Sequence, residues 1–356
     1  IIDSLGAGGA EKAVLTLAKT MINLGHPVTI ITADNIIEYD IDFDVNIHSL
    51  NFKKSRWEAT YHKFGRKLRG LVDDLEAEFG HFELITSHLQ KAHRLTALAK
   101  ITNAFYCIHS TISQASLSGR SGLRLFFKRR KIKSFLDRKD IITVSKGSQD
   151  DLLSNVHVKP KTIRTIYNPV DFDSIKKLAL EPNPYNHEKY IIHVGRLTEV
   201  KRHDILLKAY AKSNLDEKLL LLGDGPLKQK IYKLAVQLRI DSKVIFAGFH
   251  QNPYPILKHA KLYVATSEYE GFLIALVEAL FLDIPVVSTN CPHGPDEILI
   301  SALSEYLVPV GDIDKITEKI KEISLNPENA KLAIEQASLE RFDANQIASE
   351  YINLCS

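Results

Sequence analysis

The sequence predicts an α/β protein built from two doubly wound domains with parallel sheets. Its 356 residues exceed what a single hydrophobic core usually organises. Short β-branched runs alternate with amphipathic segments, a pattern typical of parallel strands joined by crossover helices. The alternation pauses near residues 168–188, where Asn-Pro pairs and polar turn residues predict a linker. We therefore expect a first domain over residues 1–168, a second over 169–340, and a C-terminal helix over 341–356 that returns to the first domain.

The individual elements follow from the spacing of apolar residues. The chain opens on Ile1-Ile2-Asp3, which we interpret as a first strand without its opening residues. The predicted buried strands are 26–33, 82–87, 140–145, 189–195, 218–223, 242–248, 261–267 and 283–289. Apolar residues recur at helical spacing in 10–25, 202–213 and 226–239.

Composition excludes several classes of protein. A hydrophobic content of 45% and a charged content of 25% are typical of a soluble globular chain. No run approaches the roughly 18 apolar residues of a membrane span. Three cysteines, far apart and odd in number, indicate neither a disulfide framework nor a zinc cluster, and fit a reducing cytoplasm. Up to residue 168 there are 25 basic against 17 acidic residues, and afterwards 21 against 26, so the two halves should meet different partners.

Candidate binding residues stand in the loops after strands, because doubly wound sheets bind ligands outside the carboxyl ends of their strands. Gly8 and Gly9 lie in a glycine-rich turn before a helix, where backbone amides can approach an anion. The turn matches neither a dinucleotide fingerprint nor a P-loop, and a plain tight turn is an equally good interpretation. Arg196 and Lys201, after the strand at 189–195, suit a diphosphate. Two solvated loop charges are the alternative.

Two glutamates, Glu270 and Glu278, stand eight positions apart in SEYEGFLIALVEAL. Eight helical residues advance about 12 Å, so these carboxylates cannot share one metal ion. They could contact two parts of one elongated ligand. Gly271, at the predicted start of the helix, offers amides that favour phosphate, and Gly223 begins the turn GDGP after another strand.

Four loops together resemble one family. GRLTEVK, LGDGP, SEYEGFLIALVEAL and PVVSTNCPHGPDEIL, in this order, are similar to motifs of the family 4 retaining glycosyltransferases. The resemblance implies the GT-B fold, with two Rossmann-like domains whose parallel sheets face a central cleft. It also implies that the first domain takes the acceptor and the second takes a nucleotide-sugar donor.

The resemblance assigns roles to single residues. Glu278 would bind the ribose hydroxyls, Glu270 would face the transferred sugar, and Arg196 and Lys201 would hold the diphosphate. His109, after an apolar run, would contact the sugar and stabilise charge near the reacting carbon, although a lone histidine is often structural. The catalytic set is then His109, Glu270, Arg196 and Lys201. The other donor-binding residues are Gly8, Gly9, Gly223, Phe249, Gly271, Phe272, Leu273 and Ile274. His88 and His93 could line the acceptor side.

No metal or other cofactor is expected. Asp40, Asp42 and Asp44 alternate with apolar residues, which fits one face of a solvated edge strand. Asp171 and Asp173 lie at the linker turn. Neither group follows a central strand of the donor domain.

Residues 120–139 form a basic segment with nine lysines and arginines, opposed only by Asp137 and interleaved with apolar residues. A basic amphipathic helix suits an anionic membrane surface, and a packed helix with a solvated basic face is the alternative. No nucleic-acid motif accompanies it. We expect a cytoplasmic enzyme, peripheral at the inner face of the membrane.

The expected function is transfer of a hexose or N-acetylhexosamine from a nucleotide sugar, with UDP as the nucleotide. The acceptor would be a growing bacterial lipopolysaccharide, O-antigen or lipid-linked glycan. Two alternatives stay open: another sugar-nucleotide enzyme of the same fold, such as an epimerase, and a non-catalytic sugar-nucleotide-binding subunit.

Overall fold

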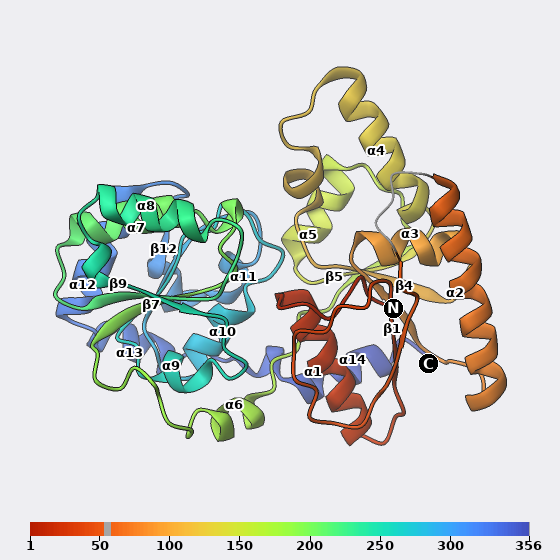
Figure 1. The fold of residues 1–356 in the computed structure, drawn as a ribbon, viewed down its shortest axis with the longest axis horizontal. Helices are drawn as coiled ribbons and strands as arrows, with labels where there is room; N and C mark the ends of the chain where they lie inside the picture. The colour runs from red at the N-terminus through yellow and green to blue at the C-terminus, as the bar shows by residue number, and fades with distance from the viewer. Residues whose placement is uncertain (53–57, 356) are drawn as a thin grey trace. The chain divides into compact units, whose positions relative to one another are not determined.

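A computed structural model describes residues 1–52 and 58–355. The chain divides into two compact units (Figure 1). The first unit comprises residues 1–169 and 344–356, and the second comprises residues 170–343. Among the described helices, none is both long and apolar enough to cross a membrane.

The sheet of the first unit is parallel throughout. Its strands are β1 (Thr29–Thr32), β2 (Asn46–Ser49), β3 (Ile85–His88), β4 (Ala104–Ile108), β5 (Asp140–Thr143) and β6 (Thr162–Thr165). Ile2 bridges Thr32 on one side and His88 on the other, so it occupies the first strand position between β1 and β3. The spatial order is therefore β2, β1, Ile2, β3, β4, β5, β6. The strand order reverses between Ile2 and β3, which is where doubly wound sheets bind ligands.

The helices of the first unit cover this sheet. They are α1 (Gly9–Asn23), α2 (Glu58–Phe79), α3 (Gln90–Leu98), α4 (Gly122–Leu136), α5 (Lys146–Asp150) and α14 (Ala344–Ile352). Two π-helical turns, Ser113–Leu117 and Asp151–Asn155, complete the unit. The last helix, α14, packs on α1, where Ile347 and Tyr351 share a buried cluster with Leu17 and Met21.

The sheet of the second unit has the spatial order β12, β11, β10, β7, β8, β9, and every pair is parallel. Its strands are β7 (Tyr190–Val194), β8 (Lys218–Leu222), β9 (Val244–Gly248), β10 (Tyr263–Ala265), β11 (Val286–Thr289) and β12 (Leu307–Val308). This is the order 3-2-1-4-5-6 read from the far edge, with its switch point between β7 and β10. All the predicted strands of this half are confirmed.

Helices lie on both faces of the second sheet, with α7 and α8 on one face and α9 and α10 on the other (Figure 1). The longer helices are α7 (His203–Ser213), α8 (Lys228–Gln237), α10 (Ile274–Phe281), α12 (Ile313–Leu325) and α13 (Glu328–Glu335). The shorter ones are α6 (Phe172–Leu178), α9 (Tyr254–Lys258) and α11 (Pro295–Ile298). The 3-10 turns are Glu199–Lys201, Asp241–Lys243, Ser301–Tyr306 and Glu340–Phe342.

One predicted element is wrong. Residues 40–44 form no edge strand, and the strand begins later, at Asn46. The alternation has another cause. Asp42 forms an ion pair with Lys19 of α1 at 2.9 Å, while Ile41 and Phe43 pack on the cluster that contains Ile2. A loop laid against α1 therefore alternates polar and apolar residues as an edge strand would.

Candidate functional site

The switch point of the second unit carries a partly buried ion pair. Lys201 ends the 3-10 turn after β7, and Glu270 lies in the loop after β10. The Lys201 ammonium donates to Glu270 Oε1 at 2.5 Å, and the side chains are only 17% and 13% exposed. The two loops that flank the switch point thus contribute opposite charges to one place.

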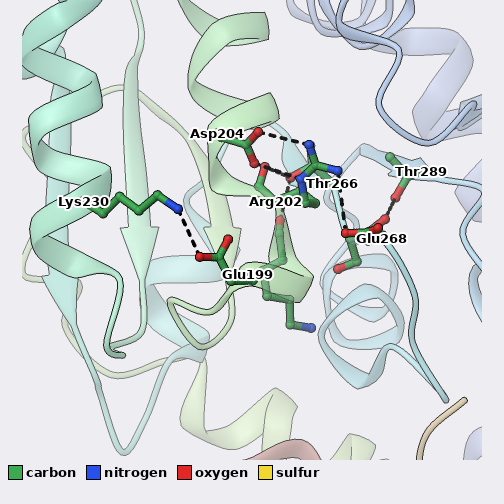
Figure 2. Close-up of polar contacts among 9 residues, drawn as sticks. Glu199, Arg202, Asp204, Lys230, Thr266, Glu268 and Thr289 are labelled. Atoms are coloured by element: carbon green, nitrogen blue, oxygen red, sulfur yellow. Dashed lines mark hydrogen bonds and ion pairs between the residues drawn. The ribbon is translucent and has the colours of Figure 1, made fainter. Parts of the chain in front are cut away.

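Hydrogen bonds to backbone carbonyls hold these two loops together (Figure 2). The Thr266 hydroxyl donates to the carbonyl oxygens of Lys201 and Arg202, at 2.9 and 3.2 Å. The amide of Glu268 donates to the Val200 carbonyl at 2.8 Å. The position of Lys201 is therefore set by the loop after β10 as well as by its own turn.

Arg202 strengthens this connection. Its backbone is left-handed, with φ of 47°, at the junction between the 3-10 turn and α7. Its guanidinium bonds both carboxylate oxygens of Asp204, at 3.0 and 3.1 Å, and lies 3.7 Å from Glu268 (Figure 2). Thr289 extends the network by donating to the Ser267 carbonyl at 2.7 Å. Side chains from three strand ends thus fix the loop that precedes Glu270.

Arg196 supplies a second cation at the same edge of the sheet. It follows β7 directly, its side chain is exposed, and the described part of the chain contains no hydrogen-bond or ion-pair partner for its guanidinium. An unpaired guanidinium can form bidentate bonds with phosphate oxygens. Arg196 and Lys201 therefore suit an anionic ligand at the end of β7.

Gly223 allows the loops after β7 and β8 to approach closely. Its φ is 139°, and a Cβ on this residue would lie 2.2 Å from the Gly195 carbonyl oxygen. Its amide donates to Gly248 at the end of β9, at 2.7 Å. Phe249 comes next, with 41% of its surface exposed. An exposed ring at this edge can stack on a flat ligand group.

The loop before α10 packs against the loop after β11. The Glu270 amide donates to the Pro292 carbonyl at 2.8 Å, and a Cβ on Gly294 would lie 3.1 Å from Phe272 Cα. The helix begins at Ile274, three residues later than predicted for Gly271. The first amides of a helix have no partner within it, so Leu273 and Ile274 lie where an anion would be stabilised.

Glu278 is buried in α10, unlike a solvated carboxylate on an exposed helix face. It is 3% exposed and accepts a hydrogen bond from the Tyr254 hydroxyl of α9 at 3.2 Å. Burial and the nearby carboxylates of Glu270 and Glu278 raise the pKa of Tyr263 well above its ordinary value. Because residues 270–273 precede the helix, the 12 Å separation expected for helical spacing does not apply to the two glutamates.

In the first unit, Gly8 and Gly9 stand where α1 begins, in the loop that follows the strand position of Ile2. Carboxylates already occupy this turn. The amide of Ala7 donates to Glu38 at 2.7 Å, and a Cβ on Gly8 would lie 2.3 Å from a Glu11 carboxylate oxygen. An incoming phosphate would have to displace a carboxylate or use other amides. A phosphate contact at Gly8 and Gly9 stays a prediction.

His109 is the first residue after β4 and contacts His88, the last residue of β3. His88 Nδ1 and His109 Nε2 are 2.8 Å apart. Burial lowers the pKa of His109 to about 4, although a hydrogen bond with Asn168 opposes the shift. His109 is therefore neutral at neutral pH.

His88 and His93 do not line an open surface, contrary to expectation. Both are only 2% exposed. His93 Nε2 lies 3.0 Å from the Ser87 carbonyl and 3.2 Å from the Cys107 carbonyl. Burial lowers the pKa of His93 to about 3.

Two of the acidic residues considered as metal ligands, Asp171 and Asp42, have structural contacts. Asp171 caps α6 by accepting from the Ser174 amide at 2.9 Å, and Asp42 pairs with Lys19. Within residues 1–52 and 58–355, no three histidine, cysteine or acidic side chains are grouped so that they could hold a metal ion.

The predicted residues thus gather at two sheet edges. Arg196, Lys201, Gly223, Phe249, Gly271, Phe272, Leu273, Ile274, Glu270 and Glu278 lie at the carboxyl edge of the second sheet, and Gly8, Gly9 and His109 lie at that of the first. Sequence reasoning missed Tyr254 and Thr266. Each acts through a partner far along the chain, so no local pattern marks it.

Both units match known families. Residues 7–174 match the family described as Glycosyltransferase Family 4, and residues 175–339 match the family described as Glycosyl transferases group 1. The chain is 28% identical over 332 residues to an enzyme of Campylobacter jejuni, N-acetylgalactosamine-N,N'-diacetylbacillosaminyl-diphospho-undecaprenol 4-alpha-N-acetylgalactosaminyltransferase. That match covers 90% of this chain and 88% of the relative.

Two further similarities extend over nearly the whole chain. It is 26% identical over 365 residues to a second Campylobacter jejuni enzyme, GalNAc-alpha-(1->4)-GalNAc-alpha-(1->3)-diNAcBac-PP-undecaprenol alpha-1,4-N-acetyl-D-galactosaminyltransferase. This match covers 99% of this chain and 96% of the relative. Among solved structures, HepE of Anabaena in complex with UDP and glucose superimposes with a TM-score of 0.78 at 19% identity, covering 99% of this chain and 97% of that one. At this identity the likeness concerns the fold.

Proposed function

Because the chain belongs to the family 4 glycosyltransferases, which are retaining enzymes of the GT-B fold, we propose that it transfers an N-acetylhexosamine or hexose from a UDP-sugar. The proposed acceptor is a lipid-linked glycan or a lipopolysaccharide. Both Campylobacter relatives are named for transfer of N-acetylgalactosamine to undecaprenol-linked glycans, and they match most of the chain. N-Acetylgalactosamine is therefore the first donor sugar to test.

The ion pair of Lys201 and Glu270, with Arg196 at the same strand end, is the observation that carries this proposal. The departing group is a nucleoside diphosphate, and its negative charge grows as the bond to the sugar breaks. Cations held in place before the reaction stabilise that charge without reorganising. In the proposed site, Arg196 and Lys201 bind the diphosphate and Glu270 turns its freed carboxylate toward sugar hydroxyls.

The transfer step balances without a protein nucleophile. The bond between the anomeric carbon and the phosphate oxygen breaks, and the acceptor oxygen bonds to the same face of that carbon. The acceptor proton passes to the departing phosphate oxygen. The carbon becomes electron-poor in this step, so a neutral His109 near it is preferable to a charged imidazolium. The low pKa of His109 supports that role.

The remaining assignments complete the donor site. Glu278 is proposed to bind the ribose hydroxyls, Phe249 to contact the base, and the amides of Phe272, Leu273 and Ile274 to bind phosphate. We propose that Gly8 and Gly9 contact the same phosphates. No metal takes part in this scheme, so transfer should persist in EDTA.

The basic helix α4 is proposed to bind an anionic membrane surface. It carries exposed apolar side chains, with Leu123 74%, Phe126 56% and Phe127 62% exposed, among lysines and arginines. Aromatic and basic residues on one exposed helix favour an interface of acidic lipid. Such binding would keep the enzyme beside a lipid-linked acceptor.

The test of function is transfer itself. Purified protein is incubated with UDP-N-acetylgalactosamine, UDP-N-acetylglucosamine, UDP-galactose or UDP-glucose, each with and without undecaprenyl-diphosphate-linked glycans. We expect UDP release to require an acceptor and mass spectrometry to show one added sugar. Interconversion of the UDP-sugars without acceptor would identify an epimerase instead. Binding of UDP-sugars without any turnover across acceptors would favour a non-catalytic subunit.

A further inference from the structure

A chain of side-chain contacts runs through the carboxyl ends of β3 and β4. His88 Nδ1 lies 2.8 Å from His109 Nε2, and His88 Nε2 lies 2.9 Å from the Thr86 hydroxyl. Both ring nitrogens of His88 are therefore engaged inside the protein. His88 is 2% exposed, so it cannot itself reach a ligand in this conformation.

We propose that His88 is a positioning residue that fixes the orientation and tautomer of His109. The inference rests on the proposed role of His109 beside the reacting carbon. The two imidazoles lie with their centroids 5.1 Å apart and their planes tilted by 37°, which brings one nitrogen of each ring together. A side chain that bonds His109 Nε2 in this way prevents rotation of the ring about its Cβ–Cγ bond.

The contact also couples the tautomers of the two rings. Burial lowers the pKa of both histidines, and the His109 ring lowers the pKa of His88 further, so both rings are neutral at neutral pH. Of two neutral nitrogens that share one hydrogen bond, one carries the hydrogen and the other accepts it. When His88 donates from Nδ1, His109 holds its hydrogen on Nδ1. When His109 donates from Nε2, its Nδ1 is an acceptor.

Thr86 sets one end of this chain. The Thr86 hydroxyl can accept from or donate to His88 Nε2. The other titratable neighbour is His93 of α3, which also disfavours charge on His88. The hydrogen of His109 is thus positioned from β3.

Three substitutions separate positioning from packing. An asparagine side-chain amide superimposes on His Nδ1, so His88→Asn retains a partner for His109. A glutamine amide superimposes on His Nε2, so His88→Gln retains only the Thr86 contact, and His88→Phe retains neither. We expect His88→Gln and His88→Phe to lower kcat by roughly 10- to 100-fold with little change in the KM for donor. His88→Asn should stay within about fivefold of the wild-type enzyme.

His93→Asn is the matched control, because His93 is equally buried but its hydrogen-bond contacts are to the backbone carbonyls of Ser87 and Cys107 and not to His109. Its effect on kcat should follow its effect on the melting temperature, whereas the His88 variants should depart from that relation. A loss of kcat in His88→Asn as large as in His88→Phe would overturn the proposal.

A spectroscopic measurement tests the coupling of the two rings without an activity assay. In protein labelled with ¹⁵N-histidine, the ring nitrogens of His109 should report one tautomer in the wild type and a mixture in His88→Phe. An unchanged tautomer in His88→Phe would overturn the proposal. If His109→Ala transfers sugar normally while the ring nitrogens respond as expected, the proposed role of His109 fails and the coupling of the two rings stands.

Discussion

In the proposed site, two anionic groups compete for the Lys201 ammonium. One is the Glu270 carboxylate, which it contacts at 2.5 Å, and the other is the diphosphate of a donor. A dianionic group close to Arg196 and Lys201 outcompetes a single carboxylate for the pair of cations. Glu270 is then released toward the sugar. In this scheme the ion pair holds the Lys201 side chain in place until the donor arrives.

Removing either cation should slow transfer. We expect Lys201→Ala and Arg196→Ala each to lower kcat/KM by about 30- to 1,000-fold, because each contact strengthens as the phosphate departs. The measurement is acceptor-dependent UDP release. Lys208→Ala, an exposed lysine on α7, is the control and should retain normal rates. Near-normal transfer in both test variants would show that Arg196 and Lys201 do not bind the diphosphate.

Replacing Glu278 tests the nucleoside end of the site. Glu278→Gln should weaken UDP binding by roughly 10- to 100-fold in calorimetry, since a neutral amide accepts more weakly from ribose hydroxyls than a carboxylate does. Tyr254→Phe removes only the hydroxyl that bonds Glu278 at 3.2 Å and should have a smaller effect. Glu278 has no role in the donor site if a folded Glu278→Gln protein binds UDP as tightly as the wild type.

At the scale of elements, α4 differs from the other helices of its unit. Ile132, Phe135 and Leu136 are buried at its C-terminal end, which packs on the unit's core. Its first turns instead expose Leu123, Phe126 and Phe127 beside basic residues. The interpretation of a packed helix with a solvated basic face therefore fits one end of α4, and the membrane interpretation fits the other.

Membrane binding through α4 is testable with vesicles. Wild-type protein should sediment with phosphatidylglycerol vesicles at low salt and be released near 0.5 M NaCl, because screening shortens the reach of each charge. Changing Arg124, Arg130 and Lys131 together to glutamate should abolish sedimentation. The control changes three exposed lysines of the second unit, Lys208, Lys233 and Lys258, to glutamate and should still sediment. Equal loss in both triple variants would mean that net charge alone matters.

At the scale of the whole molecule, each unit buries a group of histidines near its sheet edge. The first contains His88, His93 and His109, and the second contains His193 and His203, whose rings pack 4.7 Å apart. Burial lowers the pKa of His193 well below its ordinary value and that of His203 to about 4. Neutral histidines are therefore built into both units.

We expect both units to be less stable in acid than at neutral pH. The folded pKa of these histidines lies below the unfolded value of about 6.5, so the unfolded chain binds more protons between those values. The stability that they contribute is complete above pH 6.5 and is lost as the pH falls toward 4. A histidine whose folded pKa is lower by one contributes at most about 1.4 kcal/mol to the free energy of unfolding.

Urea unfolding at pH 7.5, 6 and 5, followed by circular dichroism, measures this dependence. We expect the urea concentration at the unfolding midpoint to fall steadily as the pH is lowered. His26→Gln, at an exposed position, should leave the slope unchanged, and His193→Leu should reduce it. A midpoint that is constant from pH 7.5 to 5 would contradict the prediction.

Local patterns in the sequence were enough for the architecture. Parallel strands buried on both faces require continuous apolar runs such as KYIIHVG and KLLLLG, and these runs coincide with β7 and β8. The order of motifs after the strands identified the family, and the matches over residues 7–174 and 175–339 confirm it. Both results depend on residues that are close along the chain.

Tertiary structure alone decided the partners of the site residues. Lys201 meets Glu270 across 69 positions, Glu278 meets Tyr254 across 24, and His109 meets His88 across 21. The same limit explains the misassigned strand at residues 40–44, whose alternation reflects packing on α1. Apolar periodicity reports which side of an element is buried, because burial acts on each residue separately. A hydrogen bond or an ion pair needs two side chains from different elements, and only the folded sheet brings its strand ends to one edge.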